Sequence, residues 1–166
     1  MPSHEVAASA FSPDTVELLK LFYRHNVRYV MIGGEAAIFY GHVRLTGDTD
    51  LFYDAESENC RALFAALEEF WSGDVPGLTT ARELEQEGLI VQFGRPPNRI
   101  DLVSSIDAVG FTQAWSARIE ATCVAEDESF PVYFIGIDDL LTNKRAVARP
   151  KDIADVEFLN AIARRG

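Results

Sequence analysis

Cysteine is scarce in this sequence of 166 residues, which contains only Cys60 and Cys123. Disulfide scaffolds and zinc modules need more cysteines at set spacings, so we expect two buried, reduced thiols. Long apolar runs are also missing. Stretches such as residues 89–93 are too short to cross a bilayer, so no membrane association is expected. The first ten residues do not resemble a secretory signal, and we predict a cytoplasmic protein.

Positive charge is scarce as well, with 15 Lys and Arg against 26 Asp and Glu and a net charge of −11. Nucleic-acid affinity depends largely on Lys and Arg neutralising phosphates, so extended DNA binding is not expected. One local basic cluster contains Lys144, Arg145, Arg149 and Lys151. The charge also permits a basic partner protein.

The pattern of apolar and turn residues alternates between helical and strand-like segments. Strands are predicted at 29–32, 48–53, 89–93, 99–104 and 131–135. Helices are predicted from Ser12, as cap, to 26, and at 35–40, 79–87, 111–119, 138–148 and 152–163; Ser57 is expected to cap another, through 71. The turn at 94–98 predicts a hairpin. We therefore expect one domain, 1–166, of α/β (α+β) class: a mixed β-sheet flanked by helices, with a C-terminal helical segment at 136–166.

The most informative short pattern is Asp48-Thr49-Asp50 at the start of a predicted strand. Residues two apart on a strand point to the same face, so the two carboxylates project side by side. Their repulsion is relieved by a divalent cation, and magnesium favours one or two carboxylates together with substrate phosphates. The alternative is that Asp48 sits in a turn and Asp50 caps a neighbouring group.

Gly33-Gly34 joins an apolar strand to a helix. Glycine lets a ligand approach the backbone closely, and free amides at a helix start suit a phosphate. A glycine pair alone is weak evidence because turns need glycine too. Combined with the Asp-x-Asp strand that follows, it indicates a phosphate-binding site beside a metal site.

Asp101 lies within the apolar strand Arg99-Ile-Asp-Leu-Val. A carboxylate there is costly unless it is paired or bound to a metal. If this strand lies beside the Asp48 strand, Asp101 completes a cluster of three carboxylates. Its alternative partner is Arg99, in a salt bridge on the same strand face; we favour a ligand or general base.

These motifs together resemble the signature of the polymerase-beta-like nucleotidyltransferase superfamily. The C-terminal segment narrows the resemblance to AbiEii/AbiGii-type toxin nucleotidyltransferases and their small relatives. The pattern there is a lysine in one helix, followed by Arg-x-Lys-Asp-x-x-Asp at the start of the next. The matching residues here are Lys144, Arg149, Lys151, Asp152 and Asp155.

The resemblance implies a nucleotidyltransferase fold, Mg²⁺, and transfer of a nucleoside monophosphate from a nucleoside triphosphate to an acceptor hydroxyl. It implies that Asp48, Asp50 and Asp101 are catalytic metal ligands, with Asp101 as the general base in the alternative. The phosphate site would then be formed by Gly33 and Gly34, with contacts from Arg44, Thr46 and Lys144.

The acceptor stays open between RNA, protein and a small molecule. The chain is shorter than the full toxins, and its acidic balance fits poorly with transfer RNA. An antitoxin protein is a candidate partner. Two alternatives remain: a catalytically silent binding module with this fold, and an antibiotic nucleotidyltransferase.

Lys144 has Leu140 and Leu141 on its own side of the predicted helix, so it either extends to the edge of a cavity or is simply solvated. For Asp152 and Asp155, three apart on the last helix, we expect a structural role that orients Lys144 or Arg149. We leave His42 outside the catalytic set, because a lone histidine is more often packed or solvated.

Overall fold

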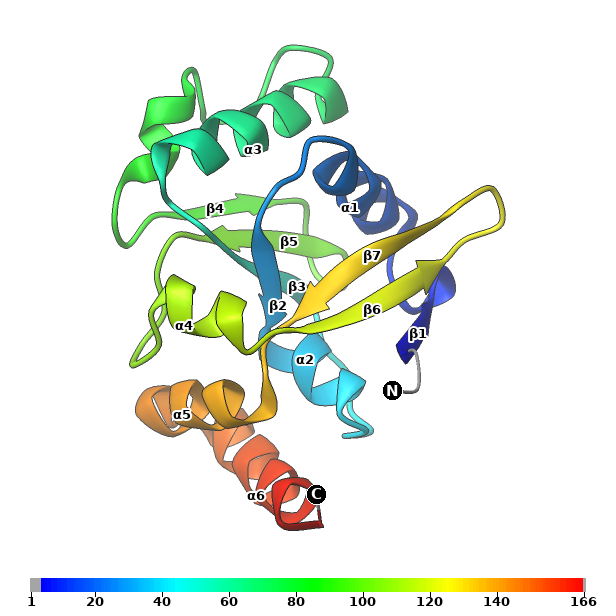
Figure 1. Ribbon diagram of the computed structural model, residues 1–166, viewed down its shortest axis with the longest axis vertical. Coiled ribbons are helices and arrows are strands. Elements are labelled where there is room, and N and C mark those ends of the chain that lie inside the picture. The colour runs from blue at the N-terminus through cyan, green and yellow to red at the C-terminus, as the bar shows by residue number, and fades with distance from the viewer. Residues whose placement is uncertain (1–3, 166) are drawn as a thin grey trace.

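A computed structural model describes residues 4–165 and shows a mixed sheet with helices around it (Figure 1). The strands of this part of the chain are β1 (His4–Ala7), β2 (Tyr29–Ile32), β3 (Asp48–Tyr53), β4 (Ile90–Phe93), β5 (Arg99–Val103), β6 (Ile119–Val124) and β7 (Ser129–Phe134). Their order across the sheet is β1-β6-β7-β2-β3-β5-β4. The helices are α1 (Pro13–Arg24), α2 (Gly33–Phe39), α3 (Ser57–Phe70), α4 (Phe111–Ser116), α5 (Ile137–Val147) and α6 (Pro150–Arg165), with 3-10 turns η1 (Ala8–Ala10) and η2 (Ala81–Glu85). The predicted α/β (α+β) class, with a mixed sheet and a C-terminal helical pair, is confirmed.

The helices are distributed over both sides of the sheet. Figure 1 shows α1 and α3 next to each other on the upper side, while α4, α5 and α6 lie below. The buried hydrophobic side chains of the described residues form one cluster. α5 and α6 pack against each other, and α5 also contacts α2. The C-terminal pair is thereby brought next to α2.

Alternation along β3 divides its side chains between the two faces of the sheet. Tyr53 faces η2, where its hydroxyl donates a hydrogen bond of 2.7 Å to the carbonyl of Leu84. Phe52 points the other way, and its ring centroid lies 5.2 Å from that of Phe111 in α4. Asp48 and Asp50 share the face of Phe52, so they lie on the α4 side of the sheet.

The strand register places the predicted acidic residues next to one another. β3 runs antiparallel to β2, with Asp50 opposite Ile32. It runs parallel to β5, with Asp50 opposite Asp101 and Asp48 opposite Arg99. A parallel pair needs a crossover connection, which α3, η2 and β4 supply. β4 then returns antiparallel to β5, as the turn at 94–98 predicted.

The predicted helix starts were partly right. The Ser12 hydroxyl accepts a hydrogen bond of 3.2 Å from the Thr15 amide and caps α1, as expected. The prediction that Ser57 caps α3 was wrong, because Glu56 occupies the cap position and Ser57 is the first helical residue. The Ser57 hydroxyl instead accepts a hydrogen bond of 2.9 Å from Arg61, one turn further along.

Two strands, β1 and β6, were not predicted. The predicted helix at 111–119 was too long, since α4 ends at Ser116 and Ile119 already belongs to β6. β6 pairs antiparallel with β7 and parallel with β1. This long-range pairing outweighs the weak local preference of the segment.

Cys123 of β6 and Cys60 are buried and free, as expected. Within residues 4–165, no helix is long and apolar enough to span a membrane.

Candidate active site

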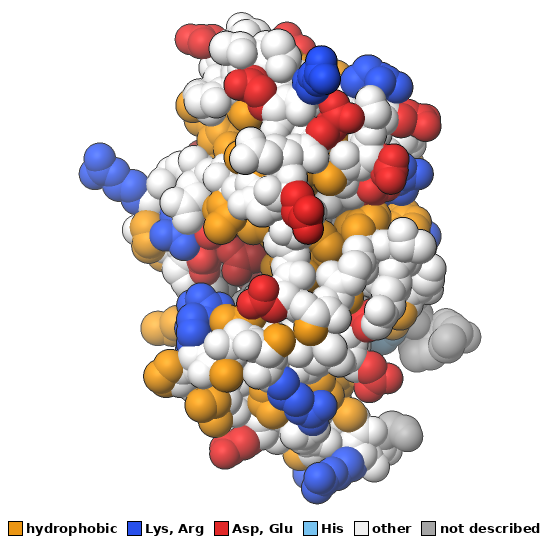
Figure 2. Space-filling view, turned by 90° about the vertical axis from the view of Figure 1, so that its left-hand side faces the viewer, with side chains coloured by type: hydrophobic (Ala, Val, Ile, Leu, Met, Phe, Trp, Pro, Cys, Tyr) orange, Lys and Arg blue, Asp and Glu red, His pale blue; other side chains and the backbone are white. Residues whose placement is uncertain are grey.

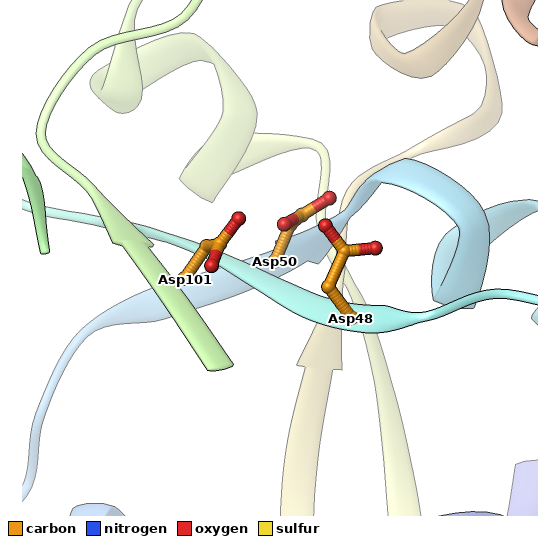
Figure 3. Close-up of side chains that lie close together, drawn as sticks. All are labelled: Asp48, Asp50 and Asp101. Atoms are coloured by element: carbon orange, nitrogen blue, oxygen red, sulfur yellow. The ribbon is translucent and has the colours of Figure 1, made fainter. Parts of the chain in front are cut away.

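Three carboxylates converge on the α4 side of the sheet, near the starts of β3 and β5. Figure 3 shows the side chains of Asp48, Asp50 and Asp101 together, two from β3 and one from β5. One oxygen from each lies within 4.8 Å of the others. The strand register produces this arrangement, because Asp101 is the direct neighbour of Asp50 across the parallel pair. The structure therefore brings the three predicted metal ligands together.

The proximity of the three acids is least favourable for Asp50. Its pKa is raised to about 7, mainly by burial and in addition by the charges of Asp48 and Asp101. The donor set consists of carboxylate oxygens, the ligands that magnesium prefers, and it is small enough to leave positions for substrate oxygens. These three residues fit a magnesium ion.

Arg99 neutralises two of the three acids. Its Nη2 lies 2.8 Å from Oδ2 of Asp48, and its Nε lies 2.9 Å from Oδ1 of Asp101. The salt bridge considered as the alternative for Asp101 is therefore present alongside the cluster. Because Arg99 stands opposite Asp48 on the neighbouring strand, it can contact both acids. No such partner contacts Asp50 within the described part of the chain.

Gly33 and Gly34 form the wall of the site at the start of α2. Gly33 has a φ of +66°, a conformation that favours glycine, and a Cβ there would collide with the carboxylate of Asp50. A Cβ on Gly34 would come within 2.7 Å of the Thr46 hydroxyl oxygen. β2 ends at Ile32, opposite Asp50, so the next two residues must pass close to the acids. Both positions thus need the absence of a side chain.

Thr46 connects this wall to the metal ligands. Its hydroxyl donates a hydrogen bond of 3.1 Å to the Asp48 carbonyl and lies 3.3 Å from Oδ1 of the same residue. Arg44, two residues earlier, passes over Gly34 and reaches Asp155 of α6, with Nε 2.9 Å from Oδ1. Side chains of the segment before β3 therefore link the acids to the C-terminal helix.

Three cationic or potentially cationic groups from different segments lie close to the Asp155 carboxylate. It is fully buried, and its carboxylate lies 2.7 Å from the Lys144 ammonium, 2.9 Å from Arg44 Nε and 3.0 Å from His42 Nδ1. The His42 ring also stacks on Phe158 of α6, with centroids 4.6 Å apart. His42 therefore has a packed position beside the buried carboxylate.

Lys144 is only 2% exposed, and its ammonium contacts both acids of α6: Asp155, and Asp152 at 3.4 Å. Asp152 in turn accepts a hydrogen bond of 2.7 Å from Nε of Arg149. The two acids hold Lys144 and Arg149 in the way expected from the sequence. The phosphate contact expected of Lys144 stays a prediction, and its ammonium already has these two partners.

Glu35 is a further acid that the sequence analysis did not single out, although it directly follows the glycine pair. Its pKa is raised to about 7, mainly by burial and in addition by the charge of Asp48, while the charge of Arg44 opposes the rise. Glu35 lines a cavity of about 390 Å³. Other residues around this cavity are Thr15, Arg44, Thr46, Thr49 and Asn98.

The raised pKa of Glu35 predicts a pH-dependent stability of the metal-free protein. In the unfolded chain Glu35 loses its proton near its ordinary pKa of 4.5, whereas in the folded chain it does so only near 7. As the pH rises between these two values, the free energy of unfolding therefore decreases. In EDTA, Glu35→Gln should therefore unfold at the same urea concentration as the parent near pH 4. Near pH 8 it should gain roughly 1–3 kcal/mol. The exposed Glu87→Gln is the control; an equal gain there, or none in Glu35→Gln, contradicts the prediction.

The surface around the site is hollowed. Figure 2 shows acidic side chains gathered in a hollow between the sheet and the C-terminal part, with basic side chains both above and below. Acidic groups at the base and basic groups on the rim suit a ligand that is itself a metal complex of an anion.

Comparison with known proteins agrees with this chemistry. Residues 14–164 match the model of a family described as a nucleotidyltransferase of unknown function, DUF6036. No curated protein matches the chain. The matched region contains all three carboxylates, the glycine pair and the acids of α6. The chain belongs to this nucleotidyltransferase family.

Proposed function

We propose that this protein is a magnesium-dependent nucleotidyltransferase that moves a nucleoside monophosphate from a nucleoside triphosphate to an acceptor hydroxyl. The observation that carries the proposal is the convergence of Asp48, Asp50 and Asp101, with oxygens within 4.8 Å of one another, beside a wall that must be glycine. Membership of a nucleotidyltransferase family supports it. Arg99 pairs with only two of the three acids, so Asp50, which burial and its neighbours disfavour as an anion, is the acid that a bound cation would stabilise most.

The chemistry follows from these positions. Magnesium held by the three carboxylates would supply charge neutralisation for the triphosphate and the departing pyrophosphate. The acceptor oxygen forms a bond to the α-phosphorus while the bond from that phosphorus to the pyrophosphate oxygen breaks. Pyrophosphate leaves with the electron pair. Asp101 takes the hydroxyl proton on its carboxylate, or it holds the metal and the proton passes to solvent water.

For the phosphates we propose contacts from the wall and the segment before β3. Gly33 and Gly34 leave room for phosphate oxygens next to the acids. Thr46 is within reach of Asp48, and Arg44 lies over Gly34. Lys144 completes the proposed set from α5. Thr46 contacts Asp48, and both Arg44 and Lys144 contact the Asp155 carboxylate.

We also propose that the protein is related to the AbiEii-type toxins and acts with an antitoxin protein as partner. The support is the order of Lys144, Arg149, Asp152 and Asp155, which form one connected network in the structure.

The acceptor is RNA, protein or a small molecule; the net charge of −11 favours an acceptor that is not a polyanion.

The proposal is tested by incubating the protein with labelled triphosphates, magnesium and a whole-cell extract, and identifying the labelled product. We expect label in one acceptor class with magnesium and none with EDTA. Calorimetry with magnesium and each triphosphate separates this from a silent binding module. Metal-dependent binding without transfer to any component would favour the module, and the absence of both would overturn the proposal.

A further inference from the structure

The backbone amide and Nε of Arg149 are hydrogen-bonded, whereas its two terminal amino groups are not bonded to any described residue. It stands directly before α6, where Asp152 accepts hydrogen bonds from its Nε at 2.7 Å and from its backbone amide at 3.2 Å. Asp152 is 2% exposed, whereas the Arg149 side chain is 57% exposed. Within residues 4–165, its two terminal amino groups have no hydrogen-bond partner. An anchored guanidinium of this kind presents its remaining donors in a fixed direction.

Arg149 is connected to the acid site through the ion pairs of α5 and α6. Its pKa is raised mainly by the hydrogen bond to Asp152, and the charges of Asp50 and Asp48 act in the same direction. Asp152 also contacts Lys144, whose partner Asp155 holds Arg44 over Gly34. A connected set of ion pairs thus runs from Arg149 to the wall of the site, and Figure 2 shows basic side chains on both borders of the hollow.

We propose that Arg149 binds the triphosphate of the nucleotide, so that the C-terminal helical pair forms one side of the nucleotide site. This rests on the proposed function. The Lys144 ammonium contacts two carboxylates and Arg44 contacts Asp155, whereas Arg149 adds two amino groups that have no carboxylate partner among the described residues. Its planar fork matches two phosphate oxygens, and Asp152 acts as the positioning residue.

The test is calorimetry of Arg149→Ala with magnesium and ATP, GTP, CTP or UTP, whichever the parent binds, and with the matching monophosphate. A lost charge-assisted contact should weaken triphosphate binding about 10- to 100-fold. Binding of the monophosphate should change little, because the β- and γ-phosphates are absent. Arg149→Lys keeps the charge but loses the fork, and should lie between the two proteins.

The matched control is Arg145→Ala, which removes an exposed arginine of α5 that contacts Asn160. Circular dichroism checks that each variant is folded. An equal loss in Arg145→Ala, or an equal loss for monophosphate, would show a general charge effect and overturn the assignment. Parental affinity in Arg149→Ala overturns it too, yet leaves the proposed function standing. If the parent binds no triphosphate, both fail.

Discussion

The Asp48→Asn/Asp50→Asn variant should lose nucleotide transfer by roughly a thousand-fold or more, without unfolding. Both carboxylates belong to the three-acid cluster, and a bound metal contributes several kcal/mol of charge stabilisation to such a reaction, where each ~1.4 kcal/mol is tenfold in rate. The amide side chains keep the shape of the acids. The variant loses the ion pair between Asp48 and Arg99, but it also removes the repulsion around Asp50, and Arg99 keeps its contact with Asp101, so the protein should stay folded. Transfer of label from the triphosphate measures the loss, and urea unfolding in EDTA checks the fold.

The matched control is Asp74→Asn/Asp107→Asn, which removes the same charge from two exposed positions. This variant should transfer label as the parent does. Calorimetry should show that magnesium binding disappears from the Asp48/Asp50 variant alone. Full transfer by that variant would mean that these acids do not hold the catalytic metal.

The Asp155→Asn variant should lose about 3–5 kcal/mol of unfolding free energy at neutral pH, the usual effect of removing one partner from a buried ion pair. Burial alone would raise the pKa of Asp155, but hydrogen bonds from Lys144 and Arg44 outweigh it and leave the pKa below its ordinary value. The stabilisation is therefore complete above that ordinary value and is lost as the pH falls through the lowered one. Urea unfolding near pH 7 measures the loss.

An exposed ion pair gives the comparison. Arg24 and Glu128 lie 2.8 Å apart at the surface, and Glu128→Gln should cost no more than about 1 kcal/mol. Similar small losses in both variants would show that the network around Asp155 adds little to stability. The larger loss expected for Asp155→Asn would show that this carboxylate contributes strongly to holding the C-terminal helix against the segment before β3.

Local sequence was sufficient for most elements. The Ser12-Pro13 start, the apolar run of β2 and the hairpin turn before Arg99 each have a preference strong enough to act alone. β6 was different, because its alternation is short and it follows a helix directly. Its pairing with β7 and β1 involves residues distant in the chain, so no local pattern could show it.

The site, like the fold, was partly predictable from local sequence and partly decided by the tertiary structure. The alternation of β3 determined that Asp48 and Asp50 share a face, because side chains on a strand repeat every two residues. That Asp101 joins them was decided by the parallel register of β3 and β5, which a crossover connection sets. The same register let Arg99 contact two acids at once. The approach of Lys144 to Asp155, eleven residues further along, was expected from the sequence. Only the packing of α6 against the segment before β3 brought Arg44 and His42 onto Asp155, because these contacts join positions more than a hundred residues apart.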